Sequence, residues 1–186
     1  MYDIIVVGAG PAGASAALIA AKAGKSTLML DNDTSITKKA WVKNHYGVKE
    51  ITGPELVETG IEQAKRFGTE TARAKVDNVE AIDGGVRVSA DSGVYEAAQV
   101  ILATGVAPAV AEASGIAVKE GTEPKIKKIV DAGRDGRTTM PGVWAAGTCA
   151  GVSVHTIVTA GHGAEVAINV VSAMNGERYV DHDVLS

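Results

Sequence analysis

The chain has 186 residues, of which 46% are hydrophobic, 22% charged and 4% aromatic, and its formal net charge is −4. Without a basic run or a set of aromatic side chains, this composition does not support binding to nucleic acid or to an acidic membrane surface. The single cysteine, Cys149, excludes an intrachain disulfide and a zinc site built on paired cysteines, and we expect no metal site. We expect one α/β domain, residues 1–186, in the cytoplasm, because neither a signal peptide nor a membrane-spanning segment is evident.

The N-terminal residues predict a βαβ unit. A β-branched run at Ile4–Val7 is typical of a buried strand, GAGPAG follows at residues 8–13, and an Ala-rich helix ends before Gly24. A second strand, Thr27–Leu30, ends at Asp31. In a dinucleotide-binding fold the three glycines make the turn, admit the pyrophosphate and let the helix pack, and the carboxylate bonds to a ribose. The alternative is a tight turn that holds no ligand.

The middle of the chain predicts a helix and an inserted antiparallel meander. Residues 32–52 show no clear period and are expected to form a loop. The next expected elements are a helix at Gly53–Phe67, a strand at Thr71–Val76, meander strands at Val79–Ile82, Val86–Ser89 and Val94–Ala98 (the meander covering about 77–98), and a separate buried strand at Val100–Ala103.

The C-terminal third carries fewer signals. Residues 106–125 show little pattern, and two short strands are expected at Lys127–Asp131 and Val143–Ala145. A final helix, Thr156–Met174, stops at Asn175-Gly176. Together the elements predict a Rossmann-like α/β fold, with a parallel sheet, helices on both faces and an inserted three-stranded antiparallel meander.

Five ordered blocks span most of the chain: DIIVVGAGPAGASAA, VKNHYGVKEITGPELVETGIEQAKRFGTE, VILATG, DGRTTMPGVWAAGT and VTAGHGAEVAI. In this order they resemble the FAD-binding half of low-molecular-weight thioredoxin reductases. The glycine motif alone does not separate FAD from NAD, and the ATG and PGVWAAG blocks favour FAD.

The resemblance implies which residues hold FAD: the glycine turn, the end of the second strand, an Asn near the isoalloxazine ring, backbone groups at the adenine, the ATG turn, the second loop and the start of the last helix. These residues are Gly8, Gly10, Pro11, Ala12, Gly13, Asp31, Asn32, Asn44, Lys75, Val76, Ala103, Thr104, Gly105, Gly147, Thr148, His155 and Thr156.

The chain departs from the family in three places. Thr148 stands where the family usually has an Asp that bonds to the ribitol, and Thr34-Ser35-Ile36 replaces a Gly-Gly-Gln stretch. The family's NADPH domain and redox-active CxxC are missing: roughly thirty residues separate Gly105 from Thr138, about the length of one βαβ unit and too few for another Rossmann unit. With one cysteine, dithiol chemistry within the chain is impossible.

Two side chains near the implied flavin, Asn44 and His155, have both a functional and a structural interpretation. Asn44 either tunes the ring or bonds its own loop backbone. His155 either supplies a proton or positive charge at the ring edge or makes a structural bond. We expect His162, between two glycines, to be structural or exposed, and Cys149 to be buried and inert.

These observations predict an FAD-dependent oxidoreductase that resembles thioredoxin reductase but is not one. Electrons would come from free NAD(P)H or from a protein partner, and no residue is identified as a catalytic acid, base or nucleophile. The alternative is a non-catalytic FAD-binding module or a subunit of a larger redox assembly. We expect a homodimer, since a surface left by a missing domain favours self-association.

Overall fold

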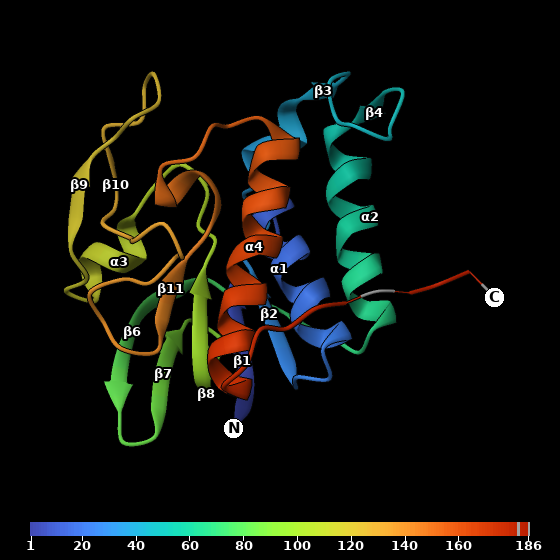
Figure 1. The fold of residues 1–186 in the computed structure, drawn as a ribbon. Coiled ribbons are helices and arrows are strands. Elements are labelled where there is room, and N and C mark those ends of the chain that lie inside the picture. The colour runs from blue at the N-terminus through green and yellow to red at the C-terminus, as the bar shows by residue number, and fades with distance from the viewer. Residues whose placement is uncertain (182, 186) are drawn as a thin grey trace.

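The computed structural model describes residues 1–181 and 183–185, and in them a mixed sheet of seven strands forms the centre of the fold (Figure 1). Its strands are β1 (Tyr2–Val7), β2 (Thr27–Asp31), β5 (Glu70–Arg73), β6 (Val76–Ile82), β7 (Gly85–Ala90), β8 (Gly93–Leu102) and β11 (Val143–Ala145). Their order is β5-β2-β1-β8-β7-β6, and β11 pairs with β8. The α/β class with an inserted antiparallel meander, β6–β8, is confirmed.

The third meander strand and the buried strand after it are one strand, which corrects the prediction of two. β8 runs unbroken from Gly93 to Leu102 and pairs with β1 along its second half. On its other side, residues up to Ala97 pair with β7 antiparallel, and those from Val100 onward pair with β11 parallel. One long strand therefore belongs to both the meander and the parallel sheet.

Helices α1 (Pro11–Lys22), α2 (Gly53–Arg66) and α4 (Thr156–Asn175) cover one face of the sheet, and their positions match the prediction closely. On β1, Ile4 and Val6 pack toward these helices, while Ile5 and Val7 pack into a second core. That second core lies under the meander, the short helix α3 (Ala109–Ala113) and η2 (Gly147–Ala150), a 3-10 turn. Continuous burial of β1 follows from this two-sided cover.

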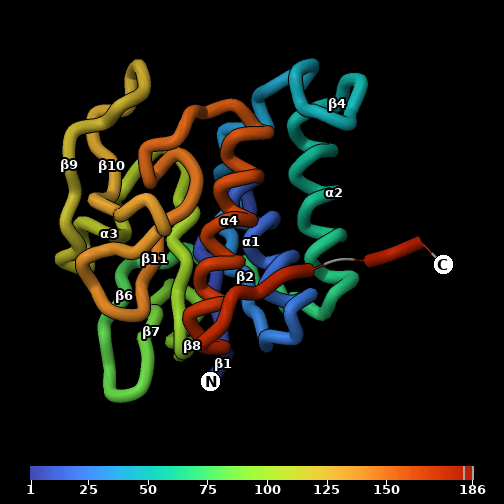
Figure 2. Tube along the Cα trace, viewed as in Figure 1, coloured from blue at the N-terminus to red at the C-terminus, as the bar shows by residue number. Residues whose placement is uncertain are grey.

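Small elements fill the segments in which the sequence shows little pattern. They are the 3-10 turn η1 (Ile36–Lys39), the ribbon of β3 (Trp41–Val42) and β4 (Ile51–Thr52), and the hairpin of β9 (Val118–Glu120) and β10 (Lys128–Val130). Figure 2 shows α3 and the β9–β10 hairpin at the opposite end of the molecule from α2. The connection from β8 to β11 is thus occupied by these two small elements.

Local signals fix both long helices outside the glycine turn. α2 begins with a capping box, in which Thr52 accepts from the Glu55 N–H and the Glu55 carboxylate accepts from the Thr52 N–H. α4 ends at Gly176, which has the left-handed backbone of a C-cap (φ 75°). By length and composition α4 would also suit a membrane span, but its buried side chains, including Val166 and Val170, pack against α1 in the core.

Candidate functional site

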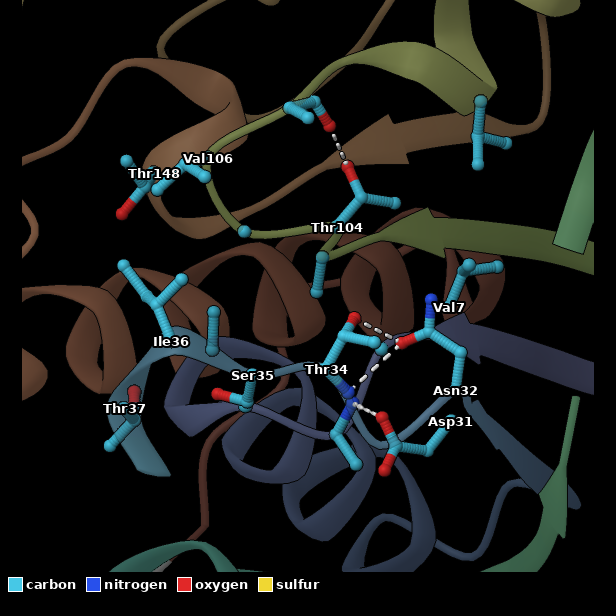
Figure 3. A pocket seen from close by; sticks show the side chains of 18 of the residues that line it. Val7, Asp31, Asn32, Thr34, Ser35, Ile36, Thr37, Thr104, Val106 and Thr148 are labelled. Carbon is cyan, nitrogen blue, oxygen red and sulfur yellow. Dashed lines mark hydrogen bonds between the residues drawn. The ribbon is translucent and has the colours of Figure 1, made fainter. Parts of the chain in front are cut away.

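A cleft of about 330 Å³ opens at the carboxyl ends of the parallel strands (Figure 3). One wall comes from the turns that follow β1 and β2, and the other from the turns that follow β8 and β11. From β1 the chain crosses to β2 on one side, and β8 lies on the other side. The cleft therefore lies at the topological switch point of the sheet, where open α/β folds bind ligands.

The glycine turn is built so tightly that two of its positions exclude any side chain. Gly8 has a left-handed backbone (φ 105°), and a Cβ there would lie 2.4 Å from the Ala103 carbonyl oxygen. A Cβ at Gly13 would lie 1.8 Å from the Gly8 carbonyl oxygen. Gly8 thus lets the turn approach the end of β8, and Gly13 lets α1 approach its own turn, as the sequence predicts.

The first turn of α1 points free backbone N–H groups at the cleft. Gly10 is the N-cap and has no side chain with which to satisfy them, and Pro11, at the first helical position, lacks an N–H of its own. The helix dipole adds partial positive charge at this end. Gly10, Pro11 and Ala12 all line the cleft, so this wall suits an anionic group such as a phosphate.

Asp31, at the end of β2, connects the two turns of this wall. Its Oδ1 accepts from the Ala9 N–H at 3.3 Å (Figure 3). The bond uses one carboxylate oxygen, and the other is available to a ligand hydroxyl. Next to it, Asn32 Oδ1 accepts from the Thr34 hydroxyl at 2.6 Å and from the Thr34 N–H at 3.3 Å. The Asp31 carboxylate thus lies where a ribose is bound in this fold.

The opposite wall is mostly apolar, with hydroxyls at two points. Thr104 donates from its hydroxyl to the Ala107 carbonyl at 2.9 Å, which closes the turn after β8. Val106 from this turn and Thr148 from η2 lie across the cleft from Ile36 (Figure 3). Thr148 is buried and contributes a neutral hydroxyl to the wall.

The loop that carries Thr148 is held by contacts from both sides. At the start of the loop, Gly147 donates its N–H to Nδ1 of His162, which lies in the second turn of α4, at 3.0 Å. The Cys149 thiol is fully buried, 3.2 Å from the Ala146 carbonyl oxygen and 3.3 Å from that of Leu102. Burial raises the pKa of this thiol, so it stays protonated at neutral pH and suits a structural role.

Most residues that the sequence assigns to FAD do line the cleft: residues 8–12 of the glycine turn, Asp31-Asn32, Lys75-Val76, the ATG turn and Thr148. Those that the structure places outside its walls are Gly13, Asn44, Gly147, His155 and Thr156. Gly13 and Gly147 shape the backbone behind the wall.

The start of α4 is organised by two histidine contacts. His155 is exposed, and its Nδ1 lies 2.7 Å from the Ser153 hydroxyl, which also donates to Glu123 at 3.2 Å. His45 Nδ1 lies 3.0 Å from the Thr156 hydroxyl and so joins the loop of Asn44 to the helix. The imidazole of His155 therefore bonds to structural neighbours beside the cleft, and Val154 takes the place on its wall.

Sequence reasoning missed part of the wall formed by residues 34–37. Ser35 packs over the glycine turn, since a Cβ at Gly10 would lie 3.1 Å from its hydroxyl oxygen. An ion pair between Asp33 and Lys38 holds this segment and lowers the pKa of the Asp33 carboxyl. The one sequence signal for this segment is that Thr34-Ser35-Ile36 replaces the Gly-Gly-Gln stretch of the family. Val154 and Thr159, also on the wall, lie within patterns typical of a loop and a core helix.

A glycine turn and a helix N-terminus at the switch point of a parallel sheet are the means by which Rossmann-class proteins bind a dinucleotide, and this chain is of that class. Residues 2–134 match the family of pyridine nucleotide-disulphide oxidoreductases, and the chain belongs to it. FAD is the cofactor of this family's thioredoxin reductase branch.

Individual relatives agree. The chain is 40% identical over 120 residues to a thioredoxin reductase of Peptoclostridium acidaminophilum, covering 62% of this chain and 38% of that protein. It is 40% identical over 110 residues to a thioredoxin reductase of Bacillus subtilis, covering 56% and 34%. The chain thus matches little more than a third of the length of these curated relatives.

Solved structures show the same fold. An atypical thioredoxin reductase, TRi, from Desulfovibrio vulgaris Hildenborough aligns with a TM-score of 0.82 at 21% identity, across 95% of this chain and 99% of that one. A ferredoxin-flavin thioredoxin reductase from Clostridium acetobutylicum aligns with a TM-score of 0.75 at 21% identity, across 94% and 98%.

The residues present fit FAD. The N–H groups at the start of α1 suit its pyrophosphate, and the Asp31 carboxylate suits its ribose. Thr148 has its hydroxyl on the cleft wall, and a bond from it to a ribityl chain would be weaker than one from a carboxylate.

Proposed function

We propose that this chain is an FAD-dependent oxidoreductase that works without a pyridine-nucleotide domain of its own. The observation that carries the proposal is the cleft at the switch point, with its uncharged, partly apolar far wall from Val106 to Val154. FAD supplies the redox chemistry when it is bound, by accepting and returning electrons. The chain's own residues hold the pyrophosphate and ribose and keep water from the apolar wall.

The electron donor that we propose is free NAD(P)H or a reduced protein partner. The support is the short connection between β8 and β11, which the family's NADPH domain would occupy and which holds only α3 and the β9–β10 hairpin in the described chain. α3 contributes Ala109 and Val110 to the cleft wall, and this short connection leaves room for a soluble donor where the family has its NADPH domain. The buried, single Cys149 gives no support to a dithiol step within this chain.

The test is anaerobic mixing of the FAD-loaded protein with NADH or NADPH, followed by absorbance of the oxidised flavin. Rapid bleaching is expected if the chain accepts nicotinamide electrons directly. Loss of bleaching in Asp31→Ala, measured at equal protein concentration, would link the reaction to this cleft. A protein that keeps FAD yet is reduced by neither nucleotide would overturn the nicotinamide donor and favour a partner-fed flavoprotein.

A non-catalytic FAD-binding module is the second candidate. One observation favours it: His155, the side chain best suited to supply a proton at the ring edge, bonds instead to Ser153 beside the cleft. Dithionite reduction separates the two candidates, because a catalytic flavoprotein returns the electrons rapidly to an added acceptor such as a quinone or a disulfide. A module that only holds FAD would be reoxidised by each acceptor no faster than free reduced FAD is.

We further propose that the protein acts in the cytoplasm as a homodimer. Exposed apolar side chains support self-association: Tyr46 is 90% exposed and Trp41 62%. Ile157 and Val158, in the first turn of α4, are also exposed, and the His45–Thr156 contact places that turn beside the loop of Tyr46. Light scattering after gel filtration tests the dimer, and a monomer at all accessible concentrations would contradict it.

A further inference from the structure

His162 occupies the point where α4, α1 and the η2 loop meet. Its ring is half-buried, and its Nδ1 accepts from the Gly147 N–H at 3.0 Å. Gly147 has a left-handed backbone (φ 78°), and a Cβ there would lie 2.6 Å from the Ala12 methyl group, so the loop is tightly seated on α1. The residue after Gly147 is Thr148, which lines the cleft, as does Ala12. One hydrogen bond from Gly147 to His162 therefore helps to hold the loop that carries Thr148 at the cleft.

The direction of this bond fixes the protonation of the ring. A backbone N–H can only donate, so His162 Nδ1 must carry a lone pair and the ring proton must lie on Nε2. A protonated ring has two N–H donors, and its Nδ1–H would face the Gly147 N–H. The bond exists only with the neutral ring.

The surroundings of the ring favour the neutral form. Burial lowers the pKa of His162, and the charge of Glu165, one turn further along α4, opposes this in part. The packed elements add no charge at this point: η2 consists of Gly, Thr, Cys and Ala, and the first turn of α1 consists of Pro, Ala, Gly and Ala. Glu165 is thus the charged group that acts on the ring.

We propose that His162 is a positioning residue for FAD: its neutral imidazole holds Gly147 so that Thr148 and the adjacent backbone face the cofactor, and protonation of the ring releases the loop. The proposal rests on FAD binding in the cleft, as proposed above. Affinity for FAD then falls as the pH is lowered through the ionisation of His162, below the ordinary histidine value of 6.5. Losing one neutral hydrogen bond corresponds to an affinity about two- to tenfold weaker.

Linkage makes the effect reciprocal. If the neutral ring favours FAD, bound FAD must favour the neutral ring, so FAD lowers the pKa of His162 by the same free energy. A histidine with a purely structural role, whose loop does not respond to the cofactor, titrates identically with and without FAD. This readout uses the unaltered protein and does not depend on any variant folding correctly.

The experiment combines a matched pair of variants with that titration. FAD binding is measured by quenching of flavin fluorescence from pH 5 to pH 8 in the wild type, His162→Asn and His162→Leu. The Asn side-chain oxygen accepts from the Gly147 N–H at every pH, whereas Leu accepts at none. The expected result is a wild-type affinity that weakens toward pH 5, a tight and flatter profile for His162→Asn, and a weak and flatter profile for His162→Leu. NMR of the imidazole Cε1–H gives the pKa of His162 with and without FAD.

The possible results separate this proposal from the proposed function. A parallel pH dependence in all three proteins, or a pKa of His162 that FAD leaves unchanged, would overturn the role of His162 while leaving FAD binding intact. No binding of FAD by the wild type at any pH would overturn the proposed function, and this proposal with it.

Discussion

Two glycines that flank His162 on α4 give the sharpest test of how the cleft is built. A Cβ at Gly163 would lie 2.0 Å from the Ala12 carbonyl oxygen, whereas ordinary contacts begin near 3.4 Å. Gly163→Ala therefore requires α4 to move away from α1 by about 1.4 Å, the difference between those distances. At Gly161, in the same helix, a Cβ meets no atom within 4 Å among the residues described. The two sites differ in packing and share their helix.

The two variants are expected to change stability in opposite directions. Gly163→Ala overpacks a backbone-to-backbone contact and should lower the free energy of unfolding by about 2–3 kcal/mol. Gly161→Ala should raise it by about 0.8 kcal/mol, because alanine is the better helix former. For a chain of this size the melting temperature then falls by about 4–12 °C in the first case and rises by about 2–3 °C in the second.

Urea unfolding and thermal melts of the two variants and the wild type provide the assay, with FAD titration as a second readout. Because Ala12 lines the cleft, Gly163→Ala should also weaken FAD binding, and Gly161→Ala should leave it unchanged. Equal stability changes in both variants, or a stable Gly163→Ala protein, would refute the account of a close α1–α4 crossing.

Three further outcomes follow from single side chains. Asp31→Ala should weaken FAD binding at least about tenfold, because it removes a charged acceptor for the ribose; unchanged affinity in a fluorescence titration would contradict the placement of the ribose. The Cys149 thiol should resist a thiol reagent such as DTNB until the protein unfolds, since it is buried and its pKa is raised; fast labelling of the native protein would show the loop to be open. Thr52→Ala should lower the free energy of unfolding by about 1 kcal/mol at pH 7. Part of this stability comes from the bond between Thr52 and the Glu55 carboxyl, which lowers the pKa of that carboxyl. This part is present above the ordinary pKa of 4.5 and is lost as the pH falls through the folded-state pKa. In urea unfolding, the free energies of unfolding of Thr52→Ala and wild type should therefore differ less below pH 4 than at pH 7.

The sequence was most informative where local rules decide the structure. The strand, glycine turn, helix and Asp31 of the βαβ unit were predictable, because Gly8 and Gly13 each stand where the structure leaves no room for a side chain. The helices α2 and α4 carry their own caps. The mistake in β8 arose because its two halves pair with different neighbours: alternation ends and full burial begins near Gln99 without a turn residue.

Tertiary contacts decided what the sequence did not. Gln99, a polar residue in the middle of β8, accepts from the Trp144 indole N–H at 2.7 Å, a partner 45 residues away. η1, β3–β4 and α3 are too short to show a period, and packing holds them in place. His162 lies between two glycines in a small-residue helix, and only the backbone of Gly147, folded against it, gives it a role.

The central claim is that this cleft binds FAD, and the visible spectrum tests it most directly. The protein is incubated with FAD, passed through a desalting column and scanned, with Gly13→Ala treated in parallel because its Cβ would collide with the Gly8 carbonyl and displace α1. The account predicts a yellow wild-type protein that retains about one flavin per chain and a variant that retains much less. A colourless wild-type protein after this treatment would contradict the cofactor, the site and the function proposed from it.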